Sequence, residues 1–300
     1  MFAPHPPAGF LPHAELSRLL AALMAHGYRC LGATLENGAI ALREIDSPDA
    51  LPRGLRAAQA PGHYRLVADP QQRYFAWANG PQMLKPLTFA PRETLWRVER
   101  DAAGALRFAP VVPEPPPLAV IGARACDLAA LALQDTHFLP RDAHYAARRG
   151  ALFLVAVQCA EPAATCFCAS TGDGPTPDSG YDLALAELSD GFIVRSGSEK
   201  GRTILEALDL APASAERIAD SIRQGEHAAA AQTRTLPGRN LRAALAGRLD
   251  HPHWDAIAAR CLACGNCTAV CPTCFCHAEA DAPALDGAHS EHERLWDSCF

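Results

Sequence analysis

The stretch "CLACGNCTAVCPTCFC", residues 261–276, places six cysteines within sixteen positions. Its first three cysteines are each separated by two residues, and the fourth follows after three more residues and precedes Pro272. A tight turn at this spacing can point three sulfurs at one iron–sulfur cubane, and in two-cluster ferredoxins the cysteine before proline binds the other cluster. We therefore predict [4Fe–4S] ligands at Cys261, Cys264, Cys267 and Cys271.

Two other interpretations of this run stay open, a zinc site and ordinary thiols. Zinc is usually bound by two separated pairs of ligands, which differs from the spacing of these cysteines. Three further cysteines of the C-terminal region do not complete a set of four, and Asp297, His277 or a cysteine elsewhere is a candidate for the missing ligand. These three are Cys274, Cys276 and Cys299.

The tetrapeptide Thr-Cys-Phe-Cys occurs twice, at residues 165–168 and 273–276. Its first copy lies in a region whose pattern predicts a βαβ unit. Cys126 follows the apolar strand "LAVIGA", and Cys159 ends the apolar strand "ALFLVAVQC". Because the carboxyl ends of adjacent parallel strands meet at one edge of a sheet, we expect these residues to gather with the loop cysteines. The predicted second [4Fe–4S] site consists of Cys126, Cys159, Cys166 and Cys168.

The other possibility for this second group is that Cys126 and Cys159 are small core residues, a common role of free cysteine. Cys30, inside a predicted hairpin, is expected to be structural in this way. Phe167 and Phe275, between the paired cysteines, are expected to shield sulfur from water.

Composition limits the classes of function. The chain has 300 residues, 12 cysteines and a net charge of −6, with its basic residues scattered. No basic stripe indicates binding to nucleic acid. The first residues lack the pattern of a secretory signal, and the apolar runs are too short to span a bilayer. We expect a soluble cytoplasmic protein, a compartment in which clustered cysteines bind metal more often than they form disulfides.

Hydrophobic periodicity predicts a mixed N-terminal region. A helix is expected over residues 13–27, followed by a hairpin around Asn37-Gly38, because Asn-Gly is a strong hairpin signal. Strands are also expected at "HYRLVA" and "RYFAWA". The proline-rich segment 110–117 predicts a domain boundary, because proline suits neither a ladder nor a helix interior.

The predicted fold class is α+β, a mixed α/β N-terminal region with a βαβ unit followed by a helical ferredoxin-type [4Fe–4S] domain. After the βαβ unit, "YDLALAEL" and "GFIVRSGS" predict a strand pair, and the chain is expected to be helical from about Ser214. The expected division is an N-terminal α/β subdomain over 1–110, a βαβ-type domain with a four-cysteine site over 118–212, and an incomplete ferredoxin-like domain over 213–300.

The residues carry a resemblance to a known family. "CLACGNCTAVCPTCFC" followed by "RLWDSCF" resembles the dicluster [4Fe–4S] component that cytoplasmic NiFe sulfhydrogenases, in which it is the β subunit, share with anaerobic sulfite reductases. The likeness extends upstream through "KPLTFAPRETLW", "IGARACDLAAL", "QCAEPAATCFCAS" and "GYDLALAEL", and covers most of residues 85–300.

This resemblance implies an electron-transfer subunit of an oxidoreductase complex rather than a stand-alone catalyst. Its expected partners are a flavoprotein subunit linked to NAD(P)H and a catalytic subunit, either a hydrogenase or a sulfite reductase. Members of the family continue past "WDSCF" to a second ferredoxin motif. The chain is therefore expected to be a fragment in which Cys261, Cys264 and Cys267 need a fourth ligand from a later segment. The alternative is that another ligand, such as Cys274, closes the cluster. Two alternatives stay open, a zinc-stabilised interaction module and a flavin-dependent oxidoreductase with its own site in the βαβ domain.

Overall fold

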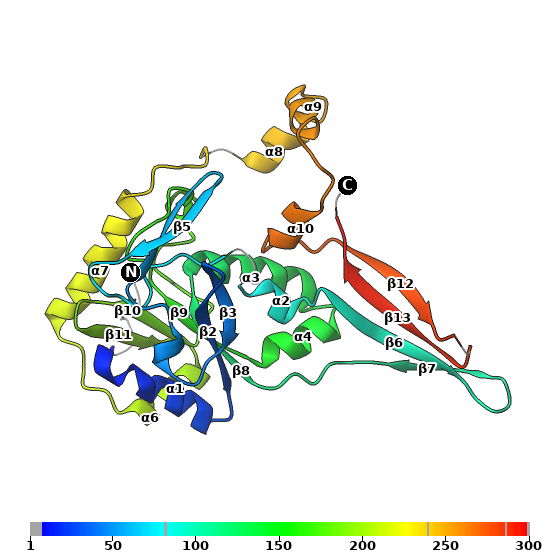
Figure 1. Cartoon of the computed structure of the whole chain (residues 1–300), viewed down its shortest axis with the longest axis horizontal. Coiled ribbons are helices and arrows are strands. Elements are labelled where there is room, and N and C mark those ends of the chain that lie inside the picture. Colours follow the sequence, from blue (N-terminus) through cyan, green and yellow to red (C-terminus); the bar gives the residue numbers. More distant parts are fainter. Residues whose placement is uncertain (1–7, 81–82, 239, 286, 299–300) are drawn as a thin grey trace.

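The computed structural model describes residues 8–80, 83–238, 240–285 and 287–298. Cys299, a candidate ligand, lies outside these described residues. Helices and strands both contribute substantially, which confirms the predicted mixed α and β architecture (Figure 1). In the described part of the chain, no helix is both long and apolar enough to cross a membrane.

Within the described residues, seven strands form one mixed sheet, the large sheet, in the order β1-β11-β10-β9-β8-β2-β3. Strands β10, β9, β8 and β2 run parallel, and the outer strands join them antiparallel. The bounds are β1 Gly9–Pro12, β2 Arg29–Glu36, β3 Ala39–Glu44, β8 Leu118–Ala123, β9 Leu152–Val157, β10 Leu183–Glu187 and β11 Gly191–Ser196. Strands from both sides of residues 110–117 pair in this sheet, so the expected boundary does not separate two sheets.

The centre of the large sheet is buried on both faces, as a parallel sheet between helices should be. Successive side chains of a strand point to opposite faces. Accordingly Ile121 of β8 packs in one hydrophobic core, whereas its neighbour Val120 packs in the other. The continuous apolar runs seen in the sequence therefore correspond to strands covered from both sides.

Helices cover each face of the large sheet (Figure 1). One face carries α1 Leu16–Ala25 and α6 Glu199–Leu208, with the short η1 His13–Glu15 before α1. The other face carries α2 Lys85–Thr88, α3 Ala125–Phe138 and α4 Ala143–Gly150. Helix α1 buries one side, at Leu16, Leu19, Leu20 and Leu23. This i, i+3, i+4, i+7 spacing is the amphipathic pattern that predicted the helix.

The hairpin predicted around Asn37-Gly38 is confirmed. Strands β2 and β3 pair antiparallel on either side of these two residues, whose φ angles are 50° and 76°. A two-residue turn of this kind needs positive φ at both positions, which asparagine and glycine tolerate best.

The segment "RYFAWA" was expected to be a strand, and this expectation is wrong. Residues 73–78 join no ladder, although Tyr74, Phe75 and Trp77 are buried in the core. The Glu187 carboxylate accepts hydrogen bonds from the backbone N–H groups of Tyr74 and Phe75, at 2.6 and 2.9 Å. A buried side chain thus satisfies the backbone donors that a neighbouring strand would otherwise satisfy.

The C-terminal region is helical only as far as residue 270. Its helices are α7 Ala215–Ala230, α8 Leu241–Ala246, α9 His253–Ala258 and α10 Asn266–Val270. Two strands follow, β12 His277–Pro283 and β13 His289–Trp296, where the sequence had predicted a helical domain throughout. The reason is long-range pairing, because β13 adds antiparallel to β6 Arg92–Arg100 of the N-terminal region.

In the described residues, β12, β13, β6 and β7 Leu106–Pro110 form an antiparallel sheet, the small sheet. Figure 1 shows it projecting away from the large sheet. A hairpin of β4 Leu55–Ala60 and β5 His63–Ala68, after η2 Pro48–Ala50, completes the strands described. The first and last parts of the chain are thereby joined, which positions the C-terminal cysteines against the body.

Candidate metal centre

Four of the predicted ligands come together at the carboxyl edge of the large sheet. Cys126 is the second residue of α3, directly after β8, and Cys159 comes two residues after β9. Cys166 lies in the loop that follows, and Cys168 begins the short helix α5 Cys168–Thr171. This is the edge at which parallel α/β sheets place their binding sites.

The thiols of this group are close enough to influence one another electrostatically. Burial raises the pKa of the Cys159 thiol, and Cys168 and Cys166 raise it further. Cys126 is exposed as a residue, but burial of its thiol raises the pKa of that group. The charges of Asp127, Cys159 and Cys168 raise this pKa further. Such mutual effects require short distances between the groups. The four upstream cysteines therefore lie in one region of the fold, and their role as ligands of one cluster stays a prediction.

Arg124 is a buried cation beside this group that sequence reasoning did not single out. Its side chain is 3% exposed and donates hydrogen bonds to backbone carbonyl groups, the best of them to Trp77 O at 2.8 Å and Phe75 O at 2.9 Å. Its charge acts against the burial that raises the pKa of Cys159 and of Cys166. The position of Arg124 in "IGARACDLAAL", immediately after the strand, is the sequence feature that could have identified it.

Two close contacts fix Cys168. The Gln232 side chain donates a hydrogen bond from Nε2 to Cys168 Sγ, at 3.2 Å, and accepts one at Oε1 from Ala169 N, at 3.0 Å. Gly174 passes so near that a Cβ added there would lie 3.3 Å from Cys168 Sγ and 2.9 Å from Ala125 Cβ. The backbone cradle around Cys168 thus depends on glycine at 174.

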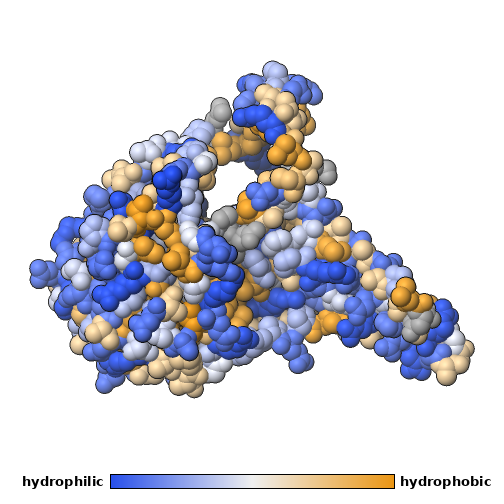
Figure 2. Space-filling view, viewed as in Figure 1, coloured by the Kyte–Doolittle hydropathy of each residue, from blue (hydrophilic) through white to orange (hydrophobic). Residues whose placement is uncertain are grey.

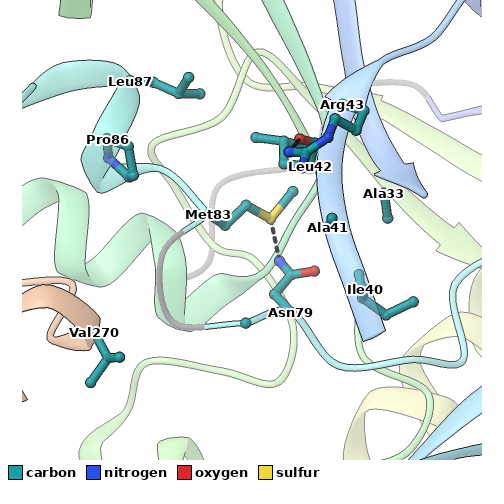
Figure 3. Close-up of a pocket in the computed structure, with 11 residues that line it drawn as sticks. Ala33, Ile40, Ala41, Leu42, Arg43, Asn79, Met83, Pro86, Leu87 and Val270 are labelled. Carbon is teal, nitrogen blue, oxygen red and sulfur yellow. Dashed lines mark hydrogen bonds between the residues drawn. The ribbon is translucent and has the colours of Figure 1, made fainter. Parts of the chain in front are cut away.

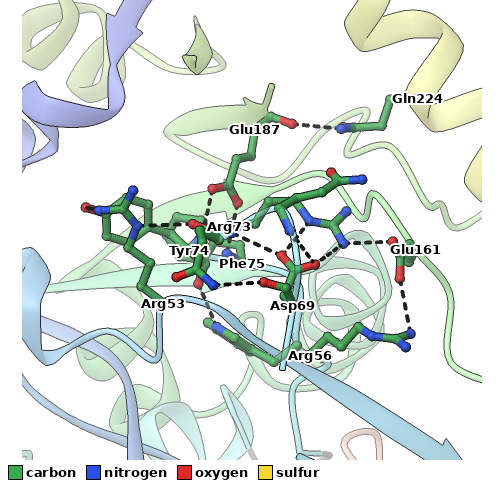
Figure 4. A network of polar contacts seen from close by, with 12 residues as sticks. Arg53, Arg56, Asp69, Arg73, Tyr74, Phe75, Glu161, Glu187 and Gln224 are labelled. Atoms are coloured by element: carbon green, nitrogen blue, oxygen red, sulfur yellow. Dashed lines mark hydrogen bonds and ion pairs between the residues drawn. The ribbon is translucent and has the colours of Figure 1, made fainter. Parts of the chain in front are cut away.

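A polar network ties the cysteine loop to the β4–β5 hairpin and the segment after it (Figure 4). Buried Arg73 bonds Asp69 and also Glu161, at 2.7 Å, two residues beyond Cys159. Ala164 N donates to Gln59 O of β4 at 3.1 Å. These contacts hold the loop in place, because each is made to a different element of the fold.

The C-terminal cysteines occupy tight turns. Ala263 and Gly265 have positive φ angles of 49° and 67°, so the chain turns sharply between the cysteines, as the spacing predicted. Cys267 lies in α10, and Cys271 follows that helix directly. The first three cysteines of the run, Cys261, Cys264 and Cys267, are exposed, whereas Cys271, Cys274 and Cys276 are half-buried.

Cys271 differs from the upstream cysteines in its electrostatics. Burial acts to raise the pKa of its thiol, but hydrogen bonds from Thr273 and the charge of Lys85 lower it on balance. The Cys271 Sγ and Thr273 Oγ1 atoms are 3.3 Å apart. A lowered thiol pKa favours the thiolate, the form that binds metal.

The other candidate ligands are placed as follows. Asp297 donates its backbone N–H to Cys276 O at 3.1 Å, so its residue lies beside the cysteine run. The exposed His277 engages its Nδ1 with Phe275 O at 2.9 Å. Cys30, expected to be structural, is buried in the same hydrophobic core as Ile121.

The cysteine run packs along α3 through Phe275 and Pro272. The Phe275 ring stacks on His137 with centroids 4.0 Å apart, although it was expected mainly to shield sulfur. Pro272 lines a small crevice together with Ala130 and Gln134 of α3. Phe167, the corresponding residue of the first Thr-Cys-Phe-Cys, is 43% exposed, much like Phe275 at 46%, but it stacks on no ring of the described residues. The repeated tetrapeptide therefore sits in two different surroundings.

Residues 231–260, which we name the arch, lead from α7 to the cysteine run (Figure 1). Figure 2 shows an opening between the arch and the body of the molecule. The arch carries exposed large apolar side chains at Leu236, Leu245, Leu249, Trp254 and Ile257. The exposed cysteines at 261–267 thus follow a segment that makes limited contact with the body.

A separate cavity of about 560 Å³ opens between β3, α2 and the end of α10 (Figure 3). Ile40 and Met83 make part of its apolar wall, and Val270 of α10 contributes another part. Its cation, Arg43, is already paired with Glu36. Among the described residues that line this cavity none is a cysteine, so it is distinct from both cysteine groups.

The donor set can be compared with what a metal requires. Nowhere in the described part of the chain do three His, Cys, Asp or Glu side chains converge on a position for a single metal ion. A [4Fe–4S] cluster bonds its thiolates to different irons, so its ligands stand farther apart than ligands of one ion. Four thiols at one sheet edge, supported by Arg124 and by the Gly174 backbone, fit a cluster of this kind.

Two comparisons with known proteins bear on these cysteines. Residues 260–300 match the family described as a 4Fe-4S dicluster domain. The predicted cofactor is thereby confirmed, since the cofactors of the chain are [4Fe–4S] clusters, whereas the assignment of individual cysteines as ligands stays a prediction.

The chain is also 34% identical over 185 residues to the Sulfhydrogenase 2 subunit beta of Pyrococcus furiosus. The aligned part covers 60% of this chain and 54% of that subunit, so the chain spans about half the length of this relative. Together the two matches confirm the resemblance to dicluster [4Fe–4S] electron-transfer subunits.

Proposed function

We propose that this chain is an iron–sulfur electron-transfer subunit of a hydrogenase-type complex. It relays single electrons between a flavoprotein subunit linked to NAD(P)H and a catalytic hydrogenase subunit. The observation that carries the proposal is the match of residues 260–300 to a 4Fe-4S dicluster domain. The likeness to a sulfhydrogenase subunit beta favours a hydrogenase over a sulfite reductase as the catalytic partner.

The proposal assigns the cysteines to two groups of cluster ligands. The upstream group holds one [4Fe–4S] cluster through Cys126, Cys159, Cys166 and Cys168. The C-terminal run holds a cluster through Cys261, Cys264 and Cys267, and Cys271 takes part in the crossed ligation expected of a two-cluster module. Cys274 and Cys276 are the remaining described candidates for the C-terminal ligand set.

Helix α3 brings the two groups near each other. Cys126 is at its start, and Pro272, next to Cys271, lies beside Ala130 and Gln134 of the same helix. Residues 126 and 130 to 134 are separated by about 6 to 12 Å along the axis, because an α-helix rises 1.5 Å per residue. Since electron transfer slows steeply with distance, this arrangement supports a relay between the two groups.

The residues around the upstream group supply a fixed and partly dry environment. When bound, a [4Fe–4S] cluster exchanges one electron at a time, at a potential set by charge, hydrogen bonds to sulfur and exposure. Gln232 provides a hydrogen bond to Cys168 Sγ, and Arg124 provides a buried positive charge. The proposed function therefore needs no general acid, general base or nucleophile.

Anaerobic purification of the protein followed by iron and sulfide analysis tests the proposal. We expect a brown protein whose Cys159→Ser variant loses about one cubane, four irons, and whose Cys264→Ser variant loses another. The electron paramagnetic resonance spectrum of each reduced variant should lack one of the wild-type signals. The matched control is Cys30→Ser, which removes a cysteine from the apolar core and should leave the iron content unchanged.

Three results would contradict the proposal. A colourless protein that contains zinc would favour an interaction module, and a yellow protein with bound flavin would favour an enzyme with its own site. Unchanged iron in both ligand variants would show that these cysteines are ordinary thiols.

A further inference from the structure

Lys85 is a buried cation next to the C-terminal cysteines. It begins α2 in the body of the molecule and is only 2% exposed. Only two of the 27 lysine and arginine residues are lysines. Position 85 is thus occupied by the rarer of the two basic residue types in this chain. Lysine is a compact point charge, whereas arginine is a wide planar group with five donors.

The surroundings of Lys85 come from the C-terminal cysteine region. Its Nζ donates a hydrogen bond to Thr268 O of α10, at 2.8 Å. The same atom lies 3.9 Å from the centroid of the Trp296 ring, a cation–π contact with β13. Thr268 follows Cys267 directly, and Trp296 precedes Asp297, which bonds Cys276. Lys85 therefore connects the body to both sides of the cysteine run.

No carboxylate of the described residues lies within 4.0 Å of the Lys85 ammonium group. Burying an ammonium group without an opposite charge is strongly unfavourable. The groups whose negative charge acts on it when they are ionised are the thiols of Cys274, Cys271 and Cys276. Burial lowers the pKa of Lys85, and these three cysteines oppose that change. Ligated cysteines stay deprotonated, so the opposite charge that Lys85 lacks is supplied by the cysteine run.

We propose that Lys85 sets the reduction potential of the cluster bound by the C-terminal cysteine run, residues 261–276, by holding a buried positive charge beside this run, between Thr268 and Trp296. The inference rests on the proposed function and deepens it, because it names a residue outside the cysteine motif that controls the relay. An added electron makes the ligand group more negative, and a nearby cation stabilises that reduced form more than the oxidised one. Lys85 therefore raises the potential of this cluster relative to the same site without the charge.

Three variants of the anaerobically prepared protein separate the charge from the contacts. Lys85→Met removes the charge and the donor, Lys85→Gln removes the charge but keeps a donor for Thr268, and Lys85→Arg keeps the charge. The measurement is the midpoint potential of each cluster, from a redox titration followed by electron paramagnetic resonance, together with iron content. The matched control is Lys200→Gln, since Lys200 is exposed and bonds only Gly150 O in the described residues.

We expect the Met and Gln variants to shift one cluster signal to a more negative midpoint potential by a similar amount. The Arg variant and the Lys200→Gln control should stay near the wild-type value. The signal of the upstream cluster, lost in Cys159→Ser, should not move in any variant and serves as an internal reference. If Lys85→Met fails to take up iron, the comparison between Lys85→Gln and Lys85→Arg decides the question.

A wild-type potential in Lys85→Gln would overturn the inference, because it would assign Lys85 to docking alone. Loss of iron from Lys85→Arg as fully as from Lys85→Gln would also overturn it, since charge would then not be the property that matters. Absence of iron from the wild-type protein would instead refute the proposed function itself. The two failures are thus distinguishable.

Discussion

Glu93 joins the C-terminal strand to the body, and its loss should destabilise the protein strongly. This carboxylate of β6 is 4% exposed and accepts hydrogen bonds from Arg294 of β13, with Nε at 3.1 Å, and from Arg148 and His144 of α4. Glu93→Gln keeps the shape of the side chain but leaves two arginines without this charge. The change therefore tests the buried ion pair rather than packing.

The expected loss follows from what remains after the substitution. Removing one partner of a buried ion pair typically costs roughly 3–5 kcal/mol, because an uncompensated charge is left behind. Arg294 still pairs with Asp142 in the variant, so we expect the lower end, about 3 kcal/mol of unfolding free energy. The matched control is Glu291→Gln, which removes a cross-strand ion pair with Arg97 in the same sheet. The Glu291 side chain is 28% exposed and that of Arg97 is 51% exposed. Its cost should be much smaller than that of Glu93→Gln, because exposed ion pairs contribute little to stability.

The assay is urea unfolding at pH 7 under anaerobic conditions, followed by far-UV circular dichroism on samples of equal iron content. Amide exchange in β13 provides a local second readout, because opening of the small sheet should accelerate it. A loss in Glu93→Gln no greater than that in Glu291→Gln would refute the reasoning. It would mean that the buried group contributes no more than an exposed one.

The same site predicts a pH dependence. Burial alone would raise the pKa of Glu93, but Arg294 and Arg148 lower it on balance below the usual 4.5. The unfolded chain then binds a proton more readily than the folded one, so this stabilisation is complete above about pH 4.5 and is lost as pH falls through the folded pKa. The difference between wild type and Glu93→Gln should therefore narrow below pH 4.5, and a constant difference down to pH 3 would contradict the assignment.

The remaining predictions concern the upstream cysteines. Gly174→Ala should lower the iron content by about one cubane, because its φ is +152° and the new Cβ would lie 2.9 Å from Ala125 Cβ and 3.3 Å from Cys168 Sγ. The control is Gly247→Ala, whose new Cβ would lie 3.9 Å from its nearest neighbour. Equal iron content in the two variants would contradict the proposed role of Gly174 in the backbone around Cys168. Arg124→Met should reduce the unfolding free energy by about 1–3 kcal/mol, since the carbonyls of Phe75 and Trp77 lose their donor in a buried site. A urea midpoint unchanged from wild type would show that water replaces the guanidinium.

Much of the fold was predictable wherever the deciding interactions are local. The Asn37-Gly38 hairpin follows from two residues that tolerate positive φ, and α1 follows from leucines at helical spacing. The central strands β8 and β9 are recognisable as uninterrupted apolar runs, because both of their faces are covered. Each signal lies within about a dozen neighbouring residues.

The cysteines show the same division between local and distant information. The spacing of residues 261–271 is itself the ligand pattern, so the sequence alone predicted the [4Fe–4S] cofactor that the dicluster match confirms. Assembly of Cys126 with Cys159 was predicted from the rule that parallel strands end at one edge, and the structure places them there. Their assignment as ligands stays a prediction that the iron analysis tests.

What only the tertiary structure decided are the contacts between distant parts of the chain. Strand β13 pairs with β6, and the contact between Glu93 and Arg294 joins residues 201 positions apart. No local sequence pattern indicates such a partner. "RYFAWA" has the composition of a strand, yet Glu187 satisfies its backbone and withdraws it from the sheet. Nothing in the sequence distinguishes Lys85 from a lysine on the surface, and only the folded structure shows it buried beside the cysteine run. Residue types and spacing determine local conformation and ligand chemistry, whereas burial, and with it the strength of every charge, is a property of the folded chain.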